Sequence, residues 1–207
     1  MGAVKAEDWN RRYEGTELVW SAQPNRFLAA EVAGLAPGRA LDLACGEGRH
    51  TVWLAELGWQ ARGLDFSDVA IAKARRLAEA RGVDAEFAVA DLTAWEPEAT
   101  RYDLVIVFYL QLPADERRAV LRKAAEAVAP GGTFLLVGHD SRNLEHGHGG
   151  PKDPGVLYTP EDVVSDLAGS GLELERAEPV QRPVETPEGE RIAIDALIRA
   201  RRAPRAS

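Results

Sequence analysis

The chain has 207 residues, a length that suits one domain with a sizeable core rather than two ordinary ones. Hydrophobic residues make up 45% and charged residues 28% of it, a balance typical of a folded globular protein and not of a disordered one. The net charge of −8 argues against a broad phosphate-binding surface, so we expect no nucleic-acid partner and a small-molecule substrate.

Features that would place the protein outside the cytoplasm are missing from the sequence. No run approaches the roughly 20 apolar residues needed to span a bilayer, and the first residues lack the apolar core of a signal peptide. The single cysteine, Cys45, excludes an intramolecular disulfide and suits a reducing compartment. We therefore expect a cytoplasmic protein that makes no membrane contact.

Short apolar strands alternate with amphipathic helices along the first two thirds of the chain. Ser67 is a good helix N-cap, and Gly58 and Gly82 are good helix stops. Strands that alternate with helices form parallel βαβ units, in which helices cover both faces of a sheet. The expected strands are residues 39–45, 60–66, 85–92, 102–110 and 133–140, and the expected helices are residues 47–58, 67–82 and 113–129.

The last third departs from this alternation. Residues 159–171 are predicted to form a helix capped by Thr159, and two alternating segments, 172–180 and 191–200, are joined by a turn-rich stretch, as in an antiparallel hairpin. The predicted fold class is therefore α/β, Rossmann-like and doubly wound. Its sheet is expected to be seven-stranded and mostly parallel, with an antiparallel C-terminal hairpin.

The stretch LDLACGEGRH, residues 41–50, lies where the first strand meets the first helix. Gly46 and Gly48 lack Cβ atoms, so the backbone there can take positive φ angles and approach a ligand at the carboxyl end of the strand. Many such turns need glycine for steric reasons alone. Asp65, about twenty residues further on at the end of the second strand, favours a ligand, because an acid there can accept hydrogen bonds from ribose hydroxyls.

The third glycine of a dinucleotide-binding turn is absent. Thr51 stands in its place, which makes an NAD(P)-dependent oxidoreductase the weaker alternative. Asp91 and Leu92 end the third strand and would suit the edge and the face of an adenine. Three acids are expected around one pocket: Asp42, Asp65 and Asp91. Their negative charges would repel pyrophosphate and favour a ligand that carries positive charge.

These segments together resemble the class I S-adenosylmethionine-dependent methyltransferases. The resemblance is carried by LDLACGEGRH, Asp65, AVADL, YDLVIVFYLQL and VAPGGTFLLVGHD, and it spans residues 39–140. The segments WNRRYEG, VWSAQPN and GEGRHTVWLAELGW are most similar to small-molecule enzymes of the tellurite-resistance and thiopurine S-methyltransferase type. The resemblance implies S-adenosylmethionine as cofactor and a small-molecule methyl acceptor, such as a thiol or another soft nucleophile.

The resemblance also implies roles for individual residues. Those implied for cofactor binding are Asp42, Ala44, Cys45, Gly46, Gly48, Arg49, Asp65, Phe66, Asp91, Leu92 and Phe108. The first five would cradle the methionine part, Arg49 would pair with its carboxylate, and Asp65 would hold the ribose. Ala44 departs from the glycine common at that position, and we interpret Cys45 as a packing residue rather than a nucleophile.

Methyl transfer from a sulfonium needs alignment of the reactants more than acid or base catalysis, unless the acceptor is an amine or a hydroxyl. The candidate catalytic residues are His139, at the end of the fifth strand, and Tyr109, beside the methyl group. His139 has the alternative role of lining the pocket or capping a loop. Tyr13 and Trp20 are expected to wall the substrate pocket together with these two residues.

We expect a single domain over residues 1–207, in which residues 1–35 form a helical lid, 39–140 the cofactor-binding core, and 141–207 a substrate-side loop, helix and hairpin. His139, Asp140, His146 and His148 would be a possible metal site, but the glycine-rich sequence around them favours a mobile lid, and we predict no metal. A non-catalytic S-adenosylmethionine-binding sensor or subunit remains an alternative. An RNA methyltransferase is disfavoured by the acidity and by FYLQLP at the end of the fourth strand.

Overall fold

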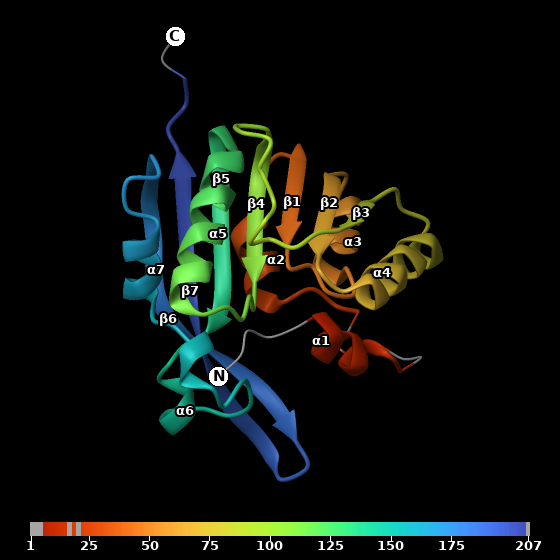
Figure 1. Cartoon of the computed structure of the whole chain (residues 1–207), viewed down its shortest axis with the longest axis vertical. Coiled ribbons are helices and arrows are strands. Elements are labelled where there is room, and N and C mark those ends of the chain that lie inside the picture. Colours follow the sequence, from red (N-terminus) through yellow and green to blue (C-terminus); the bar gives the residue numbers. More distant parts are fainter. Residues whose placement is uncertain (1–5, 16–17, 20–21, 206–207) are drawn as a thin grey trace.

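Seven strands form one sheet in the order β3-β2-β1-β4-β5-β7-β6 (Figure 1). This computed structural model describes residues 6–15, 18–19 and 22–205. Strands β1 to β5 are parallel, and β7 pairs antiparallel with both β5 and β6. The predicted fold class is therefore confirmed. The strands are β1 Arg39–Leu43, β2 Gln60–Asp65, β3 Glu86–Val89, β4 Tyr102–Phe108, β5 Val128–His139, β6 Leu172–Thr186 and β7 Gly189–Arg202.

Helices cover both faces of the sheet, with α5 and α7 packed on one face and α2 and α3 on the other (Figure 1). None of the described helices is long and apolar enough to cross a bilayer. The helices are α1 Ala6–Tyr13, α2 Arg26–Val32, α3 Arg49–Glu56, α4 Asp68–Arg81, α5 Ala114–Ala127, α6 Asn143–His146 and α7 Pro160–Asp166, with a short 3₁₀ helix at Pro154–Val156.

Strand β4 lies at the centre of the sheet because its continuous apolar run has two faces to bury. Val105 and Val107 pack in the core beneath α5, whereas Leu104 and Ile106 pack in the core beneath α2 and α3. Successive side chains of a strand point to opposite faces, and each such buried side chain stabilises the fold by about 1.5–3 kcal/mol. This central strand ends at the edge of the sheet where the candidate site lies.

The C-terminal hairpin is longer than its sequence predicts. Residues 183–190 are expected to form a turn, but β6 continues to Thr186 and β7 begins at Gly189. Two prolines of β6, Pro179 and Pro183, are tolerated because β6 is the edge strand, where a missing N–H leaves no inner ladder unpaired. The extended hairpin projects past the carboxyl ends of the parallel strands (Figure 1).

Gly48 is required by packing as well as by its backbone angle. It caps α3 with a φ of 79°, and a Cβ atom there would lie 2.7 Å from the Cβ of Ala74 on α4 and 2.9 Å from the ring of Phe87 on β3. The glycine thus lets α3, α4 and β3 approach one another. This is the steric reason for glycine that the sequence left open.

We predict that Gly48→Ala destabilises the protein more than Gly82→Ala. Gly82 also has a positive φ, of 65°, but no atom lies within 4 Å of a Cβ added there. Gly82→Ala should therefore cost only the backbone strain, about 1–2 kcal/mol. Gly48→Ala should cost about 1–3 kcal/mol more, because the added methyl group would overpack the core around it. Urea unfolding measures both, and equal losses would contradict the packing role of Gly48.

Candidate functional site

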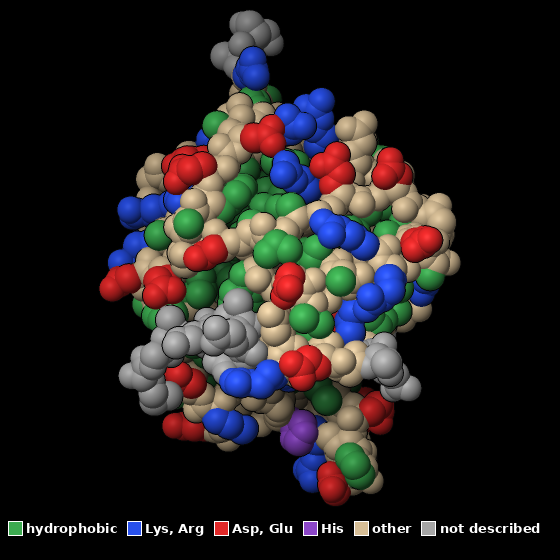
Figure 2. Space-filling view, turned by 45° about the vertical axis from the view of Figure 1, so that its right-hand side comes forward, with side chains coloured by type: hydrophobic (Ala, Val, Ile, Leu, Met, Phe, Trp, Pro, Cys, Tyr) green, Lys and Arg blue, Asp and Glu red, His purple; other side chains and the backbone are tan. Residues whose placement is uncertain are grey.

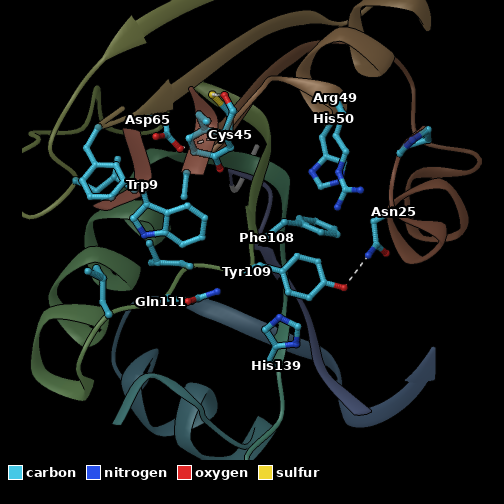
Figure 3. Close-up of a pocket in the computed structure, with 18 of the residues that line it drawn as sticks. Trp9, Asn25, Cys45, Arg49, His50, Asp65, Phe108, Tyr109, Gln111 and His139 are labelled. Carbon is cyan, nitrogen blue, oxygen red and sulfur yellow. Dashed lines mark hydrogen bonds between the residues drawn. The ribbon is translucent and has the colours of Figure 1, made fainter. Parts of the chain in front are cut away.

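A cavity of about 420 Å³ opens at the carboxyl ends of the parallel strands (Figure 3). This volume is within the range of small-molecule sites. Asp42 and Gly48 are not part of its lining, and Trp20 lies outside the described residues. The other predicted site residues all line the cavity: Tyr13, Ala44, Cys45, Gly46, Arg49, Asp65, Phe66, Asp91, Leu92, Phe108, Tyr109 and His139.

Asp65 holds the glycine turn in place. Its Oδ2 accepts a hydrogen bond of 2.8 Å from the backbone N–H of Gly46, and its Oδ1 accepts one of 2.9 Å from Ser67, the N-cap of α4. The carboxyl group is buried, which raises its pKa, although these backbone hydrogen bonds favour the ionised form. Asp65 therefore has a structural role that its sequence position does not reveal, and it also faces the cavity.

Asp42 carries a buried oxygen without a partner. Thr51, which occupies the third glycine position, donates a hydrogen bond of 2.7 Å to Oδ2 of Asp42. Oδ1 is buried and has no hydrogen-bond partner within the described part of the chain. Burial, with a smaller repulsion from Asp65, raises the pKa of Asp42 to about 7. An orphaned acceptor beneath a glycine turn is suited to an ammonium group of a ligand.

Arg49 begins α3 and reaches into the cavity (Figure 3). Among the described residues its guanidinium has no hydrogen bond or ion pair, and partial burial lowers its pKa. A partly desolvated cation without a counterion is unfavourable, so Arg49 is suited to an anionic group of a ligand.

His50, next along α3, was missed by the sequence analysis. Its ring is buried against Phe108, with ring centroids 4.6 Å apart, and its Nε2 has no partner among the described residues. Burial, assisted by the charge of Arg49, lowers the pKa of His50 well below its usual value, so the ring is neutral at neutral pH. The available signal was its position in the first turn of the helix that follows the glycines.

The described part of the N-terminal segment lies over the glycine turn. Trp9 stacks on Tyr13 with ring centroids 5.7 Å apart, and both rings line the cavity. Tyr13 is buried, and a Cβ at Gly46, which has a φ of 54°, would lie in tight contact with its hydroxyl, at 3.1 Å. Asn10 fastens α1 to α4 by donating a hydrogen bond of 2.8 Å to Asp68.

Glu47, between the two glycines, contacts both α4 and the same segment. Lys73 of α4 lies 2.9 Å from Glu47, and both side chains are almost fully buried. The two carboxylate oxygens of Glu47 also accept the backbone N–H of Val19, at 3.1 and 2.9 Å. Because Glu47 separates the two glycines, these contacts fasten both α4 and the segment between α1 and α2 to the glycine turn.

Tyr109 follows β4 with a φ of 57°, a backbone conformation that side chains rarely adopt. Its hydroxyl accepts a hydrogen bond of 2.9 Å from Asn25 (Figure 3) and donates one of 2.9 Å to Asp195. Burial, with the negative charge of Asp195, raises the pKa of Tyr109. The guanidinium of Arg182 lies over the ring, 5.6 Å from its centroid, so Tyr109 is held in place as a wall of the cavity.

Asp195 of β7 is the centre of this network and was not foreseen from the sequence. Arg182 of β6 donates to its Oδ2 at 2.7 Å, and Nδ1 of His139 lies 3.4 Å from its Oδ1. Burial opposes ionisation of Asp195, but His139 and Arg182 outweigh it and lower the pKa of the carboxyl group. Asp195 is therefore a fully buried, ionised group behind one wall of the cavity.

The loop after β5 is held by hydrogen bonds to β7, and its polar side chains lie outside the cavity lining. Asn143 donates to the carbonyl oxygen of Gly149 at 2.9 Å and accepts the N–H of Ile194 at 2.8 Å. Asp140 accepts the backbone N–H of Arg142 and, like His146 and His148, does not line the cavity. No group of three potential metal ligands occurs among the residues that the structure describes.

The amino-acid sequence of the chain is similar to those of several known proteins. A family model described as a methyltransferase domain matches residues 40–132. A ribosomal RNA small subunit methyltransferase C from Alcanivorax borkumensis is 32% identical over 129 residues, which are 60% of this chain and 37% of that protein. A trans-aconitate 2-methyltransferase from Variovorax paradoxus is 34% identical over 143 residues, which are 65% of this chain and 51% of that protein.

The similarity to one solved structure covers almost the whole chain. That protein was studied for the conversion of a disulfide bond into a thioacetal group during echinomycin biosynthesis. It is 26% identical, and the match covers 98% of this chain and 94% of that one with a TM-score of 0.76. The two curated relatives are matched over only about a third to a half of their own length.

The raised pKa of Asp42 predicts how stability changes with pH. Between about pH 4 and 7 the unfolded chain loses the Asp42 proton while the folded chain retains it, so this group lowers stability as pH rises. Asp42→Asn keeps an acceptor for Thr51 and removes the charge. Its free energy of unfolding should exceed that of the wild type at pH 7.5 by more than at pH 4.5.

Urea unfolding at the two pH values, without ligand, measures this difference. The exposed residue Asp84 provides the matched control, because Asp84→Asn should show little change between the two conditions. An advantage of Asp42→Asn that is the same at both pH values would show that Asp42 is already ionised in the folded protein at low pH.

Proposed function

This chain belongs to the class I S-adenosylmethionine-dependent methyltransferases, and on that premise we propose that it methylates a small molecule in the cavity at the carboxyl edge of the sheet. S-adenosylmethionine is the cofactor of this family. The observation that carries the proposal is the arrangement of charge around the glycine turn. Asp65 and Asp91 line the cavity on the side of β2 and β3, and Arg49 lines it at the start of α3.

The residues present fit this cofactor. Oδ1 of Asp42 and the guanidinium of Arg49, neither of which has a partner among the described residues, suit the ammonium group and the carboxylate of a methionine moiety. Gly46, which has a positive φ and lies close beneath Tyr13, lets the backbone approach the ligand. Asp65 is proposed to hold the ribose.

The adenine is proposed to lie among Phe66, Asp91 and Leu92. Leu92 is buried and offers an apolar surface, whereas Asp91 is exposed and already accepts hydrogen bonds from the N–H and hydroxyl of Thr93 through Oδ1. Its second oxygen remains for the ligand. Cys45 is buried, and burial raises the pKa of its thiol, which supports a packing role for this residue.

When bound, S-adenosylmethionine supplies a methyl group on a sulfonium whose positive charge already activates the leaving thioether. The task of the chain is alignment, which contributes on the order of 7–11 kcal/mol when reactants are well oriented. Phe108 and Tyr109, at the end of β4, are proposed to border the methyl group. Aromatic faces stabilise a neighbouring cation by roughly 0.5–2 kcal/mol.

The acceptor is proposed to lie between Tyr13, Tyr109 and His139, where His139 is the candidate proton acceptor. A small molecule is favoured over RNA because Lys and Arg side chains are interspersed with Asp and Glu on the face shown in Figure 2, and the net charge is −8. Membership of the family disfavours the NAD(P)-dependent alternative.

Two variants and two ligands test the cofactor site. Arg49→Gln should weaken binding of S-adenosylhomocysteine about tenfold to a hundredfold, because a hydrogen bond to a charged group is worth about 1.5–3 kcal/mol. It should leave 5′-methylthioadenosine unaffected, because that ligand lacks the amino-acid part. Asp65→Asn should weaken both ligands, because both contain the ribose.

Titration calorimetry measures the four affinities, with the exposed Arg81→Gln as the matched control. Equal losses for both ligands in Arg49→Gln would refute the carboxylate contact. Unchanged affinities in Asp65→Asn would refute the ribose contact.

An acceptor screen tests the activity itself. The protein is incubated with S-adenosylmethionine and thiols, phenols, amines, halides or metalloid oxyanions, and release of S-adenosylhomocysteine is measured. We expect release with at least one class. Cofactor binding without any turnover would favour a non-catalytic sensor or subunit over the proposed enzyme.

A further inference from the structure

We propose that Asp195 positions His139 as the proton acceptor of the reaction, so that the methyl acceptor enters the cavity as a protonated hydroxyl or thiol. This inference rests on the proposed function and deepens it. In it, His139 is the catalytic residue that meets the acceptor, and Asp195 is a positioning residue that acts through His139.

The antiparallel ladder between β5 and β7 sets this arrangement. His139 and Asp195 are directly paired residues in that ladder, so their side chains leave the sheet on the same face. Nδ1 of His139 lies 3.4 Å from Oδ1 of Asp195, and hydrogen bonds of catalytic groups are often this long in the absence of substrate. The pairing therefore holds the ring and the carboxylate together through the backbone of two strands.

Burial distinguishes the two nitrogens of the His139 ring. Nδ1 is buried and makes no hydrogen bond within the described part of the chain, with Oδ1 of Asp195 3.4 Å away, whereas Nε2 is not among the buried orphaned atoms. His139 lines the cavity, so Nε2 is the nitrogen that a ligand can reach. Because an ionised carboxylate only accepts hydrogen bonds, a hydrogen bond between this pair requires the proton on Nδ1 and leaves the lone pair on Nε2.

The other groups around this pair keep Asp195 ionised and the ring in place. Arg182 and the hydroxyl of Tyr109 both donate to Oδ2 of Asp195, which leaves Oδ1 toward His139. Arg182 also approaches Oδ1 at 3.4 Å through its second nitrogen. The Tyr109 ring packs on the His139 ring, with centroids 4.7 Å apart, and limits its rotation (Figure 3).

The chemistry that follows defines the class of acceptor. The proton of the acceptor O–H or S–H passes to Nε2 of His139, and the freed electron pair forms the new bond to the methyl carbon. The bond from that carbon to sulfur breaks, and a neutral thioether leaves. Asp195 stabilises the imidazolium that results, as expected for a carboxylate that orients a histidine base. A halide or another fully ionised acceptor carries no proton to transfer, so its methylation would not need this histidine base.

The tautomer of His139 tests the pair directly. The chain has four histidines, so ¹⁵N–¹H correlation spectra at pH 8.5 resolve their ring nitrogens, and His139→Gln assigns the relevant signals. We expect the Nδ1–H form in the wild type. Asp195→Asn should change it to Nε2–H, because the asparagine amide donates to Nδ1. Asp140→Asn, which removes a buried carboxylate next in the chain, should leave the tautomer unchanged.

An Nε2–H form in the wild type would overturn the proposal. This measurement is made on the wild-type protein, so it does not depend on whether Asp195→Asn folds. An unchanged tautomer in folded Asp195→Asn would overturn it as well. With an acceptor from the screen, kcat of Asp195→Asn should fall about 10²-fold or more, the usual contribution of a general base. The acceptor KM and the affinity for S-adenosylhomocysteine should stay within about threefold of the wild type.

An unchanged kcat would show that the carboxylate has only a structural role. Failure of the proposed function gives a different result, in which the wild type binds no S-adenosylhomocysteine or turns over no acceptor whatever the tautomer of His139.

Discussion

The reversal of strand order between β1 and β4 is the constraint on which the site depends. These two strands lie side by side at the centre of the sheet, and the chain leaves them toward opposite edges, which opens a crevice at their carboxyl ends. The glycine turn forms one wall of the crevice, and the strained Tyr109 backbone forms the other. Tyr13 of the N-terminal segment and Arg182 of the C-terminal hairpin also line it.

The buried and half-buried charged groups described around the site fall into two kinds. Glu47 with Lys73, and Asp195 with Arg182, are paired and hold elements together that are distant in the sequence. Arg49 and one oxygen of Asp42 have no partner among the described residues. Unpaired buried polar groups are unfavourable in a folded protein. Arg49 lines the cavity, where a ligand can supply the missing partner, and this supports a binding function for this edge of the sheet.

Two of the three non-glycine residues with a positive φ in the described part of the chain lie at the same edge, and the third, Thr100, precedes β4. Ala44 and Tyr109 follow β1 and β4 with φ angles of 60° and 57°, where a side chain is disfavoured. Such residues cost about 1–3 kcal/mol each and persist where the surrounding structure holds them. Glycine would be the less strained choice at position 44. The turn tolerates alanine there because Asp65 accepts the N–H of Gly46 and fixes the loop.

The sequence by itself determined the sheet, the glycine turn and the residues at the ends of the parallel strands. Hydrophobic alternation is a local property, and parallel strands bring their carboxyl ends to one edge, so Asp65, Tyr109 and His139 could be predicted to lie together. Asp195 and Arg182 could not, because their positions depend on the register of two antiparallel strands and on a hairpin that continues through prolines. Only the tertiary structure decided which carboxylate faces His139, since the pairing of distant strands is not written in either segment alone.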